Sequence, residues 1–220
     1  MKTSRGSSPS DPAGHFSECI WVNPSHPLRS EVEALIAQVY RDRYGAQLRH
    51  FLPHLLAFRD ATGRLSAAIG LRCGSEGQLF TEQYLQGPAE QTIAEHAGRI
   101  VAREQVVEVG NFAALGAGDA RQVIILLTSM LHRAGFRWVL FTATRNLRNA
   151  FDRLHLQTVE LAAARQECLQ SDDSDWGSYY DTQPRLMMGD IAAGHAYLAR
   201  INHAGADRVP LMACMGGALA

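Results

Sequence analysis

The stretch from Val106 to Leu156 constrains the fold of this chain more than any other part of the sequence. It begins with a mostly apolar run, Val106–Phe112, which predicts a strand. A glycine-containing loop follows, and then an apolar helical pattern that extends to about Arg133. The next run, Trp138–Thr144, shows no alternation of polar and apolar residues, which is typical of a strand buried on both faces. A short helix, Asn146–Leu156, completes the stretch. A strand, a helix and a second strand in this order predict a crossover unit.

Further strands are predicted on both sides of this unit. They are short apolar runs bounded by turn-forming residues. The runs are Cys19–Val22, Leu52–Phe58, Leu65–Leu71, Thr158–Ala163 and Arg185–Ile191. Because the second and third runs flank a turn at residues 60–63, they predict an antiparallel hairpin.

Two helices are predicted before the crossover unit. Ser30 and Glu33 have the spacing of a capping box, and the apolar residues behind them predict a helix from residue 31 to 44. Pro88 opens another predicted helix, whose apolar face includes Ile100. The combined order of elements predicts an α/β fold with a mixed, mostly antiparallel central sheet flanked by helices.

The composition changes towards both ends of the 220-residue chain. Residues 1–17 are polar and rich in serine, proline and glycine, so we expect a disordered leader. Residues 18–200 have the length and pattern of a single domain. Residues 201–220 are rich in glycine and alanine and lack periodicity, so we expect a C-terminal tail there.

Charge and hydropathy exclude two classes of partner. The net charge is −1, from 21 basic and 22 acidic residues. This balance provides no electrostatic footprint for nucleic acid or for an anionic membrane surface. The longest apolar stretch lies around Val123–Leu127, far short of the ~20 residues that a membrane-spanning helix needs. We therefore expect no nucleic-acid partner and no integral membrane association.

The cysteines and histidines point to a reducing compartment without a metal site. The four cysteines are widely spaced: Cys19, Cys73, Cys168 and Cys214. This spacing favours free thiols and hence a cytoplasmic protein. The nine histidines form no metal-ligand pattern, so no metal is expected.

The loop after the first strand of the crossover unit is a candidate anion site. The start of a helix presents free backbone N–H groups, and Gly116 and Gly118 allow a ligand to approach the backbone closely. Arg121 adds a positive charge in the first turn. This combination suits a pyrophosphate, while the simpler interpretation is a flexible turn.

The order of elements around this loop resembles the GNAT acyltransferase superfamily. The resemblance implies that the loop and helix cradle the pyrophosphate of coenzyme A, that the preceding strand pairs with the pantetheine arm, and that an asparagine-bearing helix lies beside the donor. The corresponding donor-binding residues are Val109, Asn111, Phe112, Gly116, Gly118, Arg121, Asn146 and Asn149. Asp119 places a negative charge in this loop, so an acyl carrier protein is an alternative donor to acyl-CoA.

Several sequence blocks are similar to the thermostable hemolysin family. They cover most of residues 30–195: Arg43–Gly45, Leu79–Leu85, Glu108–Ala113, Phe141–Asn149, Trp176–Asp181 and Gly189–Ile191. The family's name implies a lytic activity. The resemblance also implies a GNAT-like fold related to acyl-homoserine lactone synthases. Because fold alone does not determine function, lysis and acyl transfer both remain open.

Two carboxylates are candidate catalytic groups. Glu108 interrupts an apolar strand beside the expected donor site, where a partly desolvated carboxylate can take the proton of an attacking amine. The structural alternative is an ion pair with a neighbouring arginine. Glu82 lies with Tyr84 on one face of a segment that alternates as a strand does. Glu82 can bind the acceptor amine or act as the base, or it can belong to an exposed polar face.

The aromatic cluster at Trp176–Tyr180 supplies candidate acids. Tyr179 or Tyr180 can protonate the departing thiolate, since this role needs a hydroxyl near the sulfur. The structural alternative is that these aromatic side chains cap the core where the sheet opens.

The sequence therefore supports three functional hypotheses. The first is an acyltransferase that moves an acyl group from an acyl-CoA or acyl-carrier-protein thioester to the amine of a small acceptor. The second is a membrane-damaging thermostable hemolysin. The third is a protein that binds an acyl thioester without turning it over, for which Asp119 is the main argument.

Overall fold

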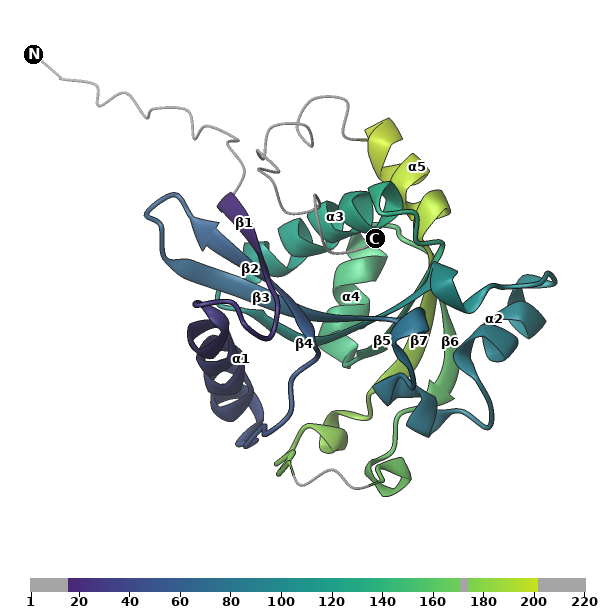
Figure 1. Ribbon diagram of the computed structural model, residues 1–220, viewed down its shortest axis with the longest axis horizontal. Helices are drawn as coiled ribbons and strands as arrows, with labels where there is room; N and C mark the ends of the chain where they lie inside the picture. The colour runs from purple at the N-terminus through teal and green to yellow at the C-terminus, as the bar shows by residue number, and fades with distance from the viewer. Residues whose placement is uncertain (1–15, 171–173, 202–220) are drawn as a thin grey trace, which may run out of the picture.

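The computed structural model describes residues 16–170 and 174–201, which contain a seven-stranded sheet with helices on both faces (Figure 1). The strands are β1 (Phe16–Val22), β2 (His54–Asp60), β3 (Leu65–Cys73), β4 (Val106–Ala114), β5 (Trp138–Ala143), β6 (Thr158–Ala163) and β7 (Arg185–Asp190). The helices are α1 (Arg29–Tyr44), α2 (Ala89–Ala97), α3 (Ala117–Arg133), α4 (Arg145–Arg153) and α5 (Ile191–Ile201). The strand order is β1-β2-β3-β4-β5-β7-β6.

The crossover unit is β4–α3–β5, and its two strands are parallel neighbours. The other neighbouring pairs in the described sheet are antiparallel, including the predicted β2–β3 hairpin. The predicted mixed α/β fold is thus confirmed.

Side-chain alternation shows how the helices cover the sheet. On β2, Leu55 and Ala57 pack with α1, whereas Leu56 and Phe58 pack with α3. Since successive residues of a strand point to opposite faces, α1 and α3 lie on opposite faces of the sheet. Residues of α2 pack on the face that α1 covers, while α4 and α5 pack with α3. In Figure 1, α1 lies near β1–β3 and α2 near β6.

Some predicted boundaries are wrong. The first helix begins at Arg29, so Ser30 lies inside it and makes no capping box; Leu28 occupies the N-cap position without a side-chain cap. The helix that follows Pro88 ends at Ala97, because Gly98 adopts a left-handed conformation with φ 64°. Ile100 is therefore outside the helix and 97% exposed.

The ends of the described region also differ from the expectation. Phe16 and Ser17 belong to β1, and the remainder of the predicted leader, 1–17, lies outside the described residues. The last strand is followed by α5, a helix that the sequence analysis does not predict. Apart from Ile201, which ends α5, the predicted tail at 201–220 lies outside the described residues.

The sheet opens between its two parallel strands. Pairing between β4 and β5 ends at Val109 and Phe141. Beyond this point β4 continues along β3 as far as Ala114, and β5 continues along β7 as far as Ala143. The two strands therefore diverge, and a gap forms in the middle of the sheet.

A bulge in β4 accompanies this gap. Asn111 has a φ of 48°, and the register with β3 shifts between Ala68 and Gly70. The Asn111 side chain folds over Gly70 and accepts a hydrogen bond from the Leu52 N–H (2.8 Å). A Cβ at position 70 would lie 2.8 Å from Asn111 Oδ1, so glycine is required there. Bulges of this kind redirect a strand, which is how β4 turns away from β5.

Candidate functional site

Two cavities meet at the gap between β4 and β5. One lies on the α3 side of the sheet and is called the apolar cavity. The other lies on the α1 side and is called the aromatic cavity. Five residues line both of them: Tyr40, Val109, Gly110, Asn111 and Thr142. Because four of these residues, all except Tyr40 of α1, stand at the end of the β4–β5 pairing, the gap is the place where the two cavities communicate.

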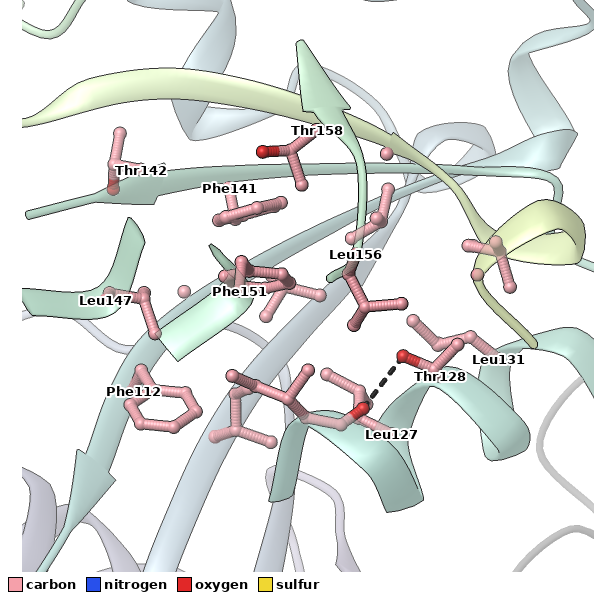
Figure 2. A pocket seen from close by; sticks show the side chains of 18 of the residues that line it. Phe112, Leu127, Thr128, Leu131, Phe141, Thr142, Leu147, Phe151, Leu156 and Thr158 are labelled. Carbon is pink, nitrogen blue, oxygen red and sulfur yellow. Dashed lines mark hydrogen bonds between the residues drawn. The ribbon is translucent and has the colours of Figure 1, made fainter. Parts of the chain in front are cut away.

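The apolar cavity lies between the sheet, α3 and α4 (Figure 2). Its wall includes Phe112, Leu127, Leu131 and a stacked pair of rings, Phe141 and Phe151, with centroids 4.7 Å apart. Among its few polar lining groups, the Thr128 hydroxyl donates to the Ile124 carbonyl (2.8 Å). That hydroxyl is thus already satisfied within α3. An apolar wall of this kind suits a hydrocarbon chain.

The aromatic cavity has a different character. Its walls combine Phe80, Tyr84, Trp176 and Tyr180 with two charged side chains, Glu108 and Arg72, and with His50. Glu108 is the one carboxylate among the residues that line this cavity. A charged and aromatic space therefore faces an apolar one across the gap.

Glu108 is buried, with 1% of its surface exposed. Its Oε2 accepts the Phe80 N–H (2.9 Å) and its Oε1 accepts the Thr81 N–H (2.6 Å), so it caps the short 3₁₀ helix η2 (Phe80–Tyr84). Burial raises the pKa of Glu108 above its ordinary value, against the opposing effects of these two N–H groups and of Arg72. A raised pKa brings a carboxylate closer to the working range of a general base. No ion pair joins Glu108 to another described residue. The structural role of Glu108 is therefore that of a helix cap and not the predicted ion pair with an arginine.

Glu82 lies on η2, since the segment predicted as an alternating strand forms a 3₁₀ helix. Its carboxylate accepts the N–H groups of Leu79 and Ala89 (2.8 Å each) and two hydrogen bonds from Arg103 (2.6 and 3.0 Å). Burial raises the pKa of Glu82, but the bonds from Arg103 and the two N–H groups outweigh it and leave the pKa lowered. Glu82 is absent from the lining of the aromatic cavity. These contacts give it a structural role in the present conformation.

The two candidate tyrosines occupy different positions around the gap. Tyr179 is buried and donates from its hydroxyl to Thr142 Oγ1 (3.3 Å), at the point where the cavities meet. Burial raises the pKa of Tyr179 to about 12. The Tyr180 hydroxyl lies 2.6 Å from the hydroxyl of Tyr84, whose pKa burial also raises. The Tyr180 partner, Tyr84, was not among the predicted catalytic residues.

The same tyrosines also pack as core residues. Tyr179 contacts the rings of Tyr40, Tyr44 and Trp176, with centroids 5.2–6.0 Å apart. The rings thus close the core, as the structural alternative predicts, and the role of the two hydroxyls as acids stays a prediction.

A third opening lies beside the gap, between α1, α3 and α4. Arg43, Phe112, Ala120 and Asn146 line it. Arg43 donates to the Ala114 carbonyl at the end of β4, and its place here was not predicted. The predicted donor residue Asn146 is thus adjacent to the gap. Asn149 is exposed on α4 and does not line this opening.

The predicted glycine loop is shorter than expected. Gly116 is the N-cap of α3, and Gly118 lies in the first helical turn. Asp119 Oδ2 accepts the Gly116 N–H (2.9 Å), so a carboxylate occupies the donor that we expected a phosphate to use. Gly118 and Arg121 are exposed and remain predicted donor-binding residues.

The sequence matches the family described as thermostable hemolysin over residues 22–195. The chain belongs to the thermostable hemolysin family. The resemblance noted from the sequence blocks is thereby confirmed. A search of the curated proteins finds no match to the sequence.

Solved structures similar to this thermostable hemolysin include an N-acyl amino acid synthase and an acyl-homoserine lactone synthase. FeeM, an N-acyl amino acid synthase from uncultured soil microbes, aligns with a TM-score of 0.55 at 12% identity, over 84% of this chain and 98% of FeeM. BjaI, a CoA-dependent acyl-homoserine lactone synthase solved with MTA, aligns with a TM-score of 0.52 at 12% identity, over 86% of this chain and 89% of BjaI. TofI, in a ternary complex with an inhibitor and MTA, aligns with a TM-score of 0.51 at 18% identity, over 82% of this chain and 96% of TofI. At these identities the comparison establishes the fold, and it confirms the predicted GNAT-like fold.

Within residues 16–170 and 174–201, no helix has the length and apolar character needed to cross a membrane. In the same part of the chain, no group of three or more histidine, cysteine, aspartate or glutamate side chains is placed to hold a metal ion.

Proposed function

We propose that this chain transfers an acyl group from a thioester donor, either acyl-CoA or an acylated carrier protein, to the amine of a small acceptor. One observation supports the proposal above the others. The gap between β4 and β5 joins an apolar cavity to a second cavity whose lining contains one carboxylate, Glu108. An acyl chain and an amine can thus approach the same point from opposite faces of the sheet.

The donor enters through the opening beside Arg43 and Asn146, with Arg121 and Asn149 on the adjoining surface as further predicted contacts. Its acyl chain lies in the apolar cavity, and its thioester carbon lies at the gap. Beyond Val109, the residues of β4 no longer pair with β5. Their backbone N–H groups can therefore bind the pantetheine arm and polarise the thioester carbonyl.

The acceptor enters the aromatic cavity with its amine towards Glu108. The amine nitrogen attacks the thioester carbon, so that a C–N bond forms and the C–S bond breaks. The proton of the amine passes to the Glu108 carboxylate, directly or through a water molecule. The departing thiolate takes a proton from the hydroxyl of Tyr179 or Tyr180, which lie at and beside the gap. The proton held by Glu108 then returns through water to the tyrosinate, which restores both groups.

The similar structures support the reaction class. FeeM is named an N-acyl amino acid synthase, and BjaI is named a CoA-dependent acyl-homoserine lactone synthase. Both names describe acyl transfer. Free thiols at Cys73 and Cys168 are compatible with the reducing cytoplasm, which we propose as the location of the protein.

The test is detection of the amide product. Purified full-length protein is incubated with acyl-CoAs or acylated carrier proteins of several chain lengths and a mixture of small amines. Thiol release and the product mass are then followed. We expect an N-acyl product whose amount rises with protein concentration. Donor binding without product would favour the non-catalytic hypothesis.

The family's name keeps membrane damage as the second candidate. Helix α3 contains the longest apolar stretch of the sequence, and its residues Val123, Leu126 and Met130 are buried against the sheet, which fits a core element. An amphiphilic acyl product can also lyse membranes, so lysis is compatible with the enzyme. Leakage of lipid vesicles caused by purified protein alone, without any thioester, would support direct membrane damage.

A further inference from the structure

We infer that the acceptor is an α-amino acid with an aromatic side chain, bound with its amine at Glu108, its carboxylate at Arg72 and its ring among the aromatic side chains of the aromatic cavity. This inference rests on the proposed function and specifies its acceptor. Three observations carry it, namely the spacing of the two charges, the state of the Arg72 guanidinium and the arrangement of the rings.

The two charges are neighbours on adjacent strands. Arg72 of β3 and Glu108 of β4 are direct Cα partners in the antiparallel register, and both side chains line the aromatic cavity. Residues opposite each other in this way have Cβ atoms about 4.5–5.5 Å apart. An acceptor that contacts both groups must carry its amine and its carboxylate close together. An α-amino acid does so, because both groups are attached to one carbon.

Arg72 has the capacity to bind a carboxylate. Its Nη1 donates to the Gln78 carbonyl (3.0 Å), and no carboxylate among residues 16–170 and 174–201 lies within ion-pair distance of it. Glu108 attracts it but is engaged with the N–H groups of Phe80 and Thr81. A guanidinium has five N–H donors in a planar fork that matches a carboxylate. A bound carboxylate would therefore complete the hydrogen bonding of Arg72.

Aromatic rings form the remaining wall. Trp176 contacts Phe80 with centroids 6.1 Å apart and Tyr180 with centroids 5.7 Å apart, and Tyr180 contacts Tyr179 at 5.2 Å. The Tyr84 and Tyr180 hydroxyls bind each other at 2.6 Å. The pairs Trp176–Tyr180 and Tyr179–Tyr180 pack edge to face, and an aromatic wall of this kind favours another ring as its ligand. An aromatic side chain would thus bind more tightly here than a methyl group.

The experiment compares acceptors that differ by one group. Purified full-length protein receives a medium-chain acyl-CoA and either L-phenylalanine, phenethylamine or L-alanine, and kcat/KM is measured for amide formation. Phenethylamine is L-phenylalanine without the carboxylate, and L-alanine lacks the ring. We expect L-phenylalanine to exceed each of the others at least about tenfold, since a charge-assisted carboxylate contact and a buried ring are each lost.

The Arg72→Met variant tests whether Arg72 binds the carboxylate of the acceptor. The ratio of kcat/KM for L-phenylalanine over phenethylamine should fall to about one in Arg72→Met. The control Arg64→Met removes an exposed arginine from the turn between β2 and β3 and should keep the wild-type ratio.

The outcomes separate this inference from the proposed function. If wild-type protein uses phenethylamine as well as L-phenylalanine, the inference is wrong and the acyltransferase remains. If L-alanine equals L-phenylalanine, the aromatic assignment is wrong. If none of the three amines gives an amide while the donor panel and amine mixture described above do, the inference is wrong and the acyltransferase remains. If that panel gives no amide either, the proposed function fails as well. The wild-type comparison decides these cases even if Arg72→Met fails to fold.

Discussion

Residue 108 combines a structural and a chemical role. The Glu108 carboxylate caps η2 through the Phe80 and Thr81 N–H groups, yet each oxygen retains a lone pair that can face the cavity. The cap holds the carboxylate in one position, and burial raises its pKa. The same contacts that stabilise η2 therefore orient a candidate base.

The Glu108→Gln variant should lose acyl transfer while retaining the donor. An amide cannot accept the proton of the amine, and general base catalysis contributes about 10²–10⁴-fold. We expect kcat to fall at least about 100-fold, measured by amide formation. Glu104→Gln is the matched control, because Glu104 is exposed and lies in the short 3₁₀ turn that precedes β4. Full activity in Glu108→Gln would rule out its role as base.

The pH dependence of kcat/KM should report the protonation of Glu108. The reactive form of Glu108 is the deprotonated one, and its pKa lies above the usual 4.5. The kcat/KM of the wild type should therefore rise with pH through an acid limb whose midpoint is above 4.5. In Glu108→Gln the residual rate should lack this limb. A limb that persists unchanged in the variant would assign it to another group.

At the scale of elements, Arg103 organises the wall of the aromatic cavity. Its guanidinium donates to Glu82 and Glu90 and to the carbonyls of Gly74 (2.8 Å) and Gly77 (2.6 Å). These bonds tie the segment that leads into η2 to α2. Since η2 supplies the N–H groups that hold Glu108, Arg103 supports the site without contacting it.

The Arg103→Met variant should lower the free energy of unfolding by about 2–4 kcal/mol, because it leaves the largely buried Glu82 without its cation.

The wild type should also lose stability in acid. The folded-state pKa of Glu82 is lowered, so its contribution is present above the usual pKa and disappears as pH falls through the lowered value. This loss should be smaller in Arg103→Met. Denaturant unfolding at several pH values measures both effects, with Arg64→Met as control; equal stability of the two variants would contradict the account.

Helix α5 closes the far end of the apolar cavity. A Cβ at Gly194 would lie 3.5 Å from Leu156 and 3.6 Å from Thr128, and both of these residues line the cavity. A large side chain at this position should therefore occupy space that the acyl chain uses.

The Gly194→Leu variant should prefer donors shorter by about two to four carbons. Each buried methylene contributes about 0.8 kcal/mol, or roughly fourfold in affinity, so the preference should shift clearly along an acyl-CoA series. Ala193→Leu places the same side chain on the exposed side of α5 and should keep the wild-type preference. An unchanged preference in Gly194→Leu would mean that the acyl chain ends elsewhere.

The elements of the crossover unit could be predicted because their apolar patterns are local. Glu108 can be predicted from the sequence because a carboxylate interrupts an apolar run. Arg72 and Arg103 could not be found in this way, since their positions depend on strand register and on loop packing between residues far apart in the sequence. Glu82 lies on a 3₁₀ helix with a repeat of three residues, and the five residues of this element are too few to distinguish that repeat from the two-residue alternation of a strand.

At the scale of the whole molecule, the divergence of β4 and β5 is the feature on which the proposed function depends. Four paired positions hold the strands together, from Val106–Trp138 to Val109–Phe141, and the Asn111 bulge then turns β4 away. The apolar cavity lies on one face of the sheet and the aromatic cavity on the other. A sheet without the gap would separate donor from acceptor.

The measurement that tests this account most directly is native mass spectrometry of the purified full-length protein with a panel of acyl-CoAs and acylated carrier proteins. The account predicts that one donor class is retained at one molecule per chain, that retention depends on acyl chain length, and that Glu108→Gln retains the donor as the wild type does. Retention of no thioester of either class would contradict the central claim that the gap between β4 and β5 is a thioester site.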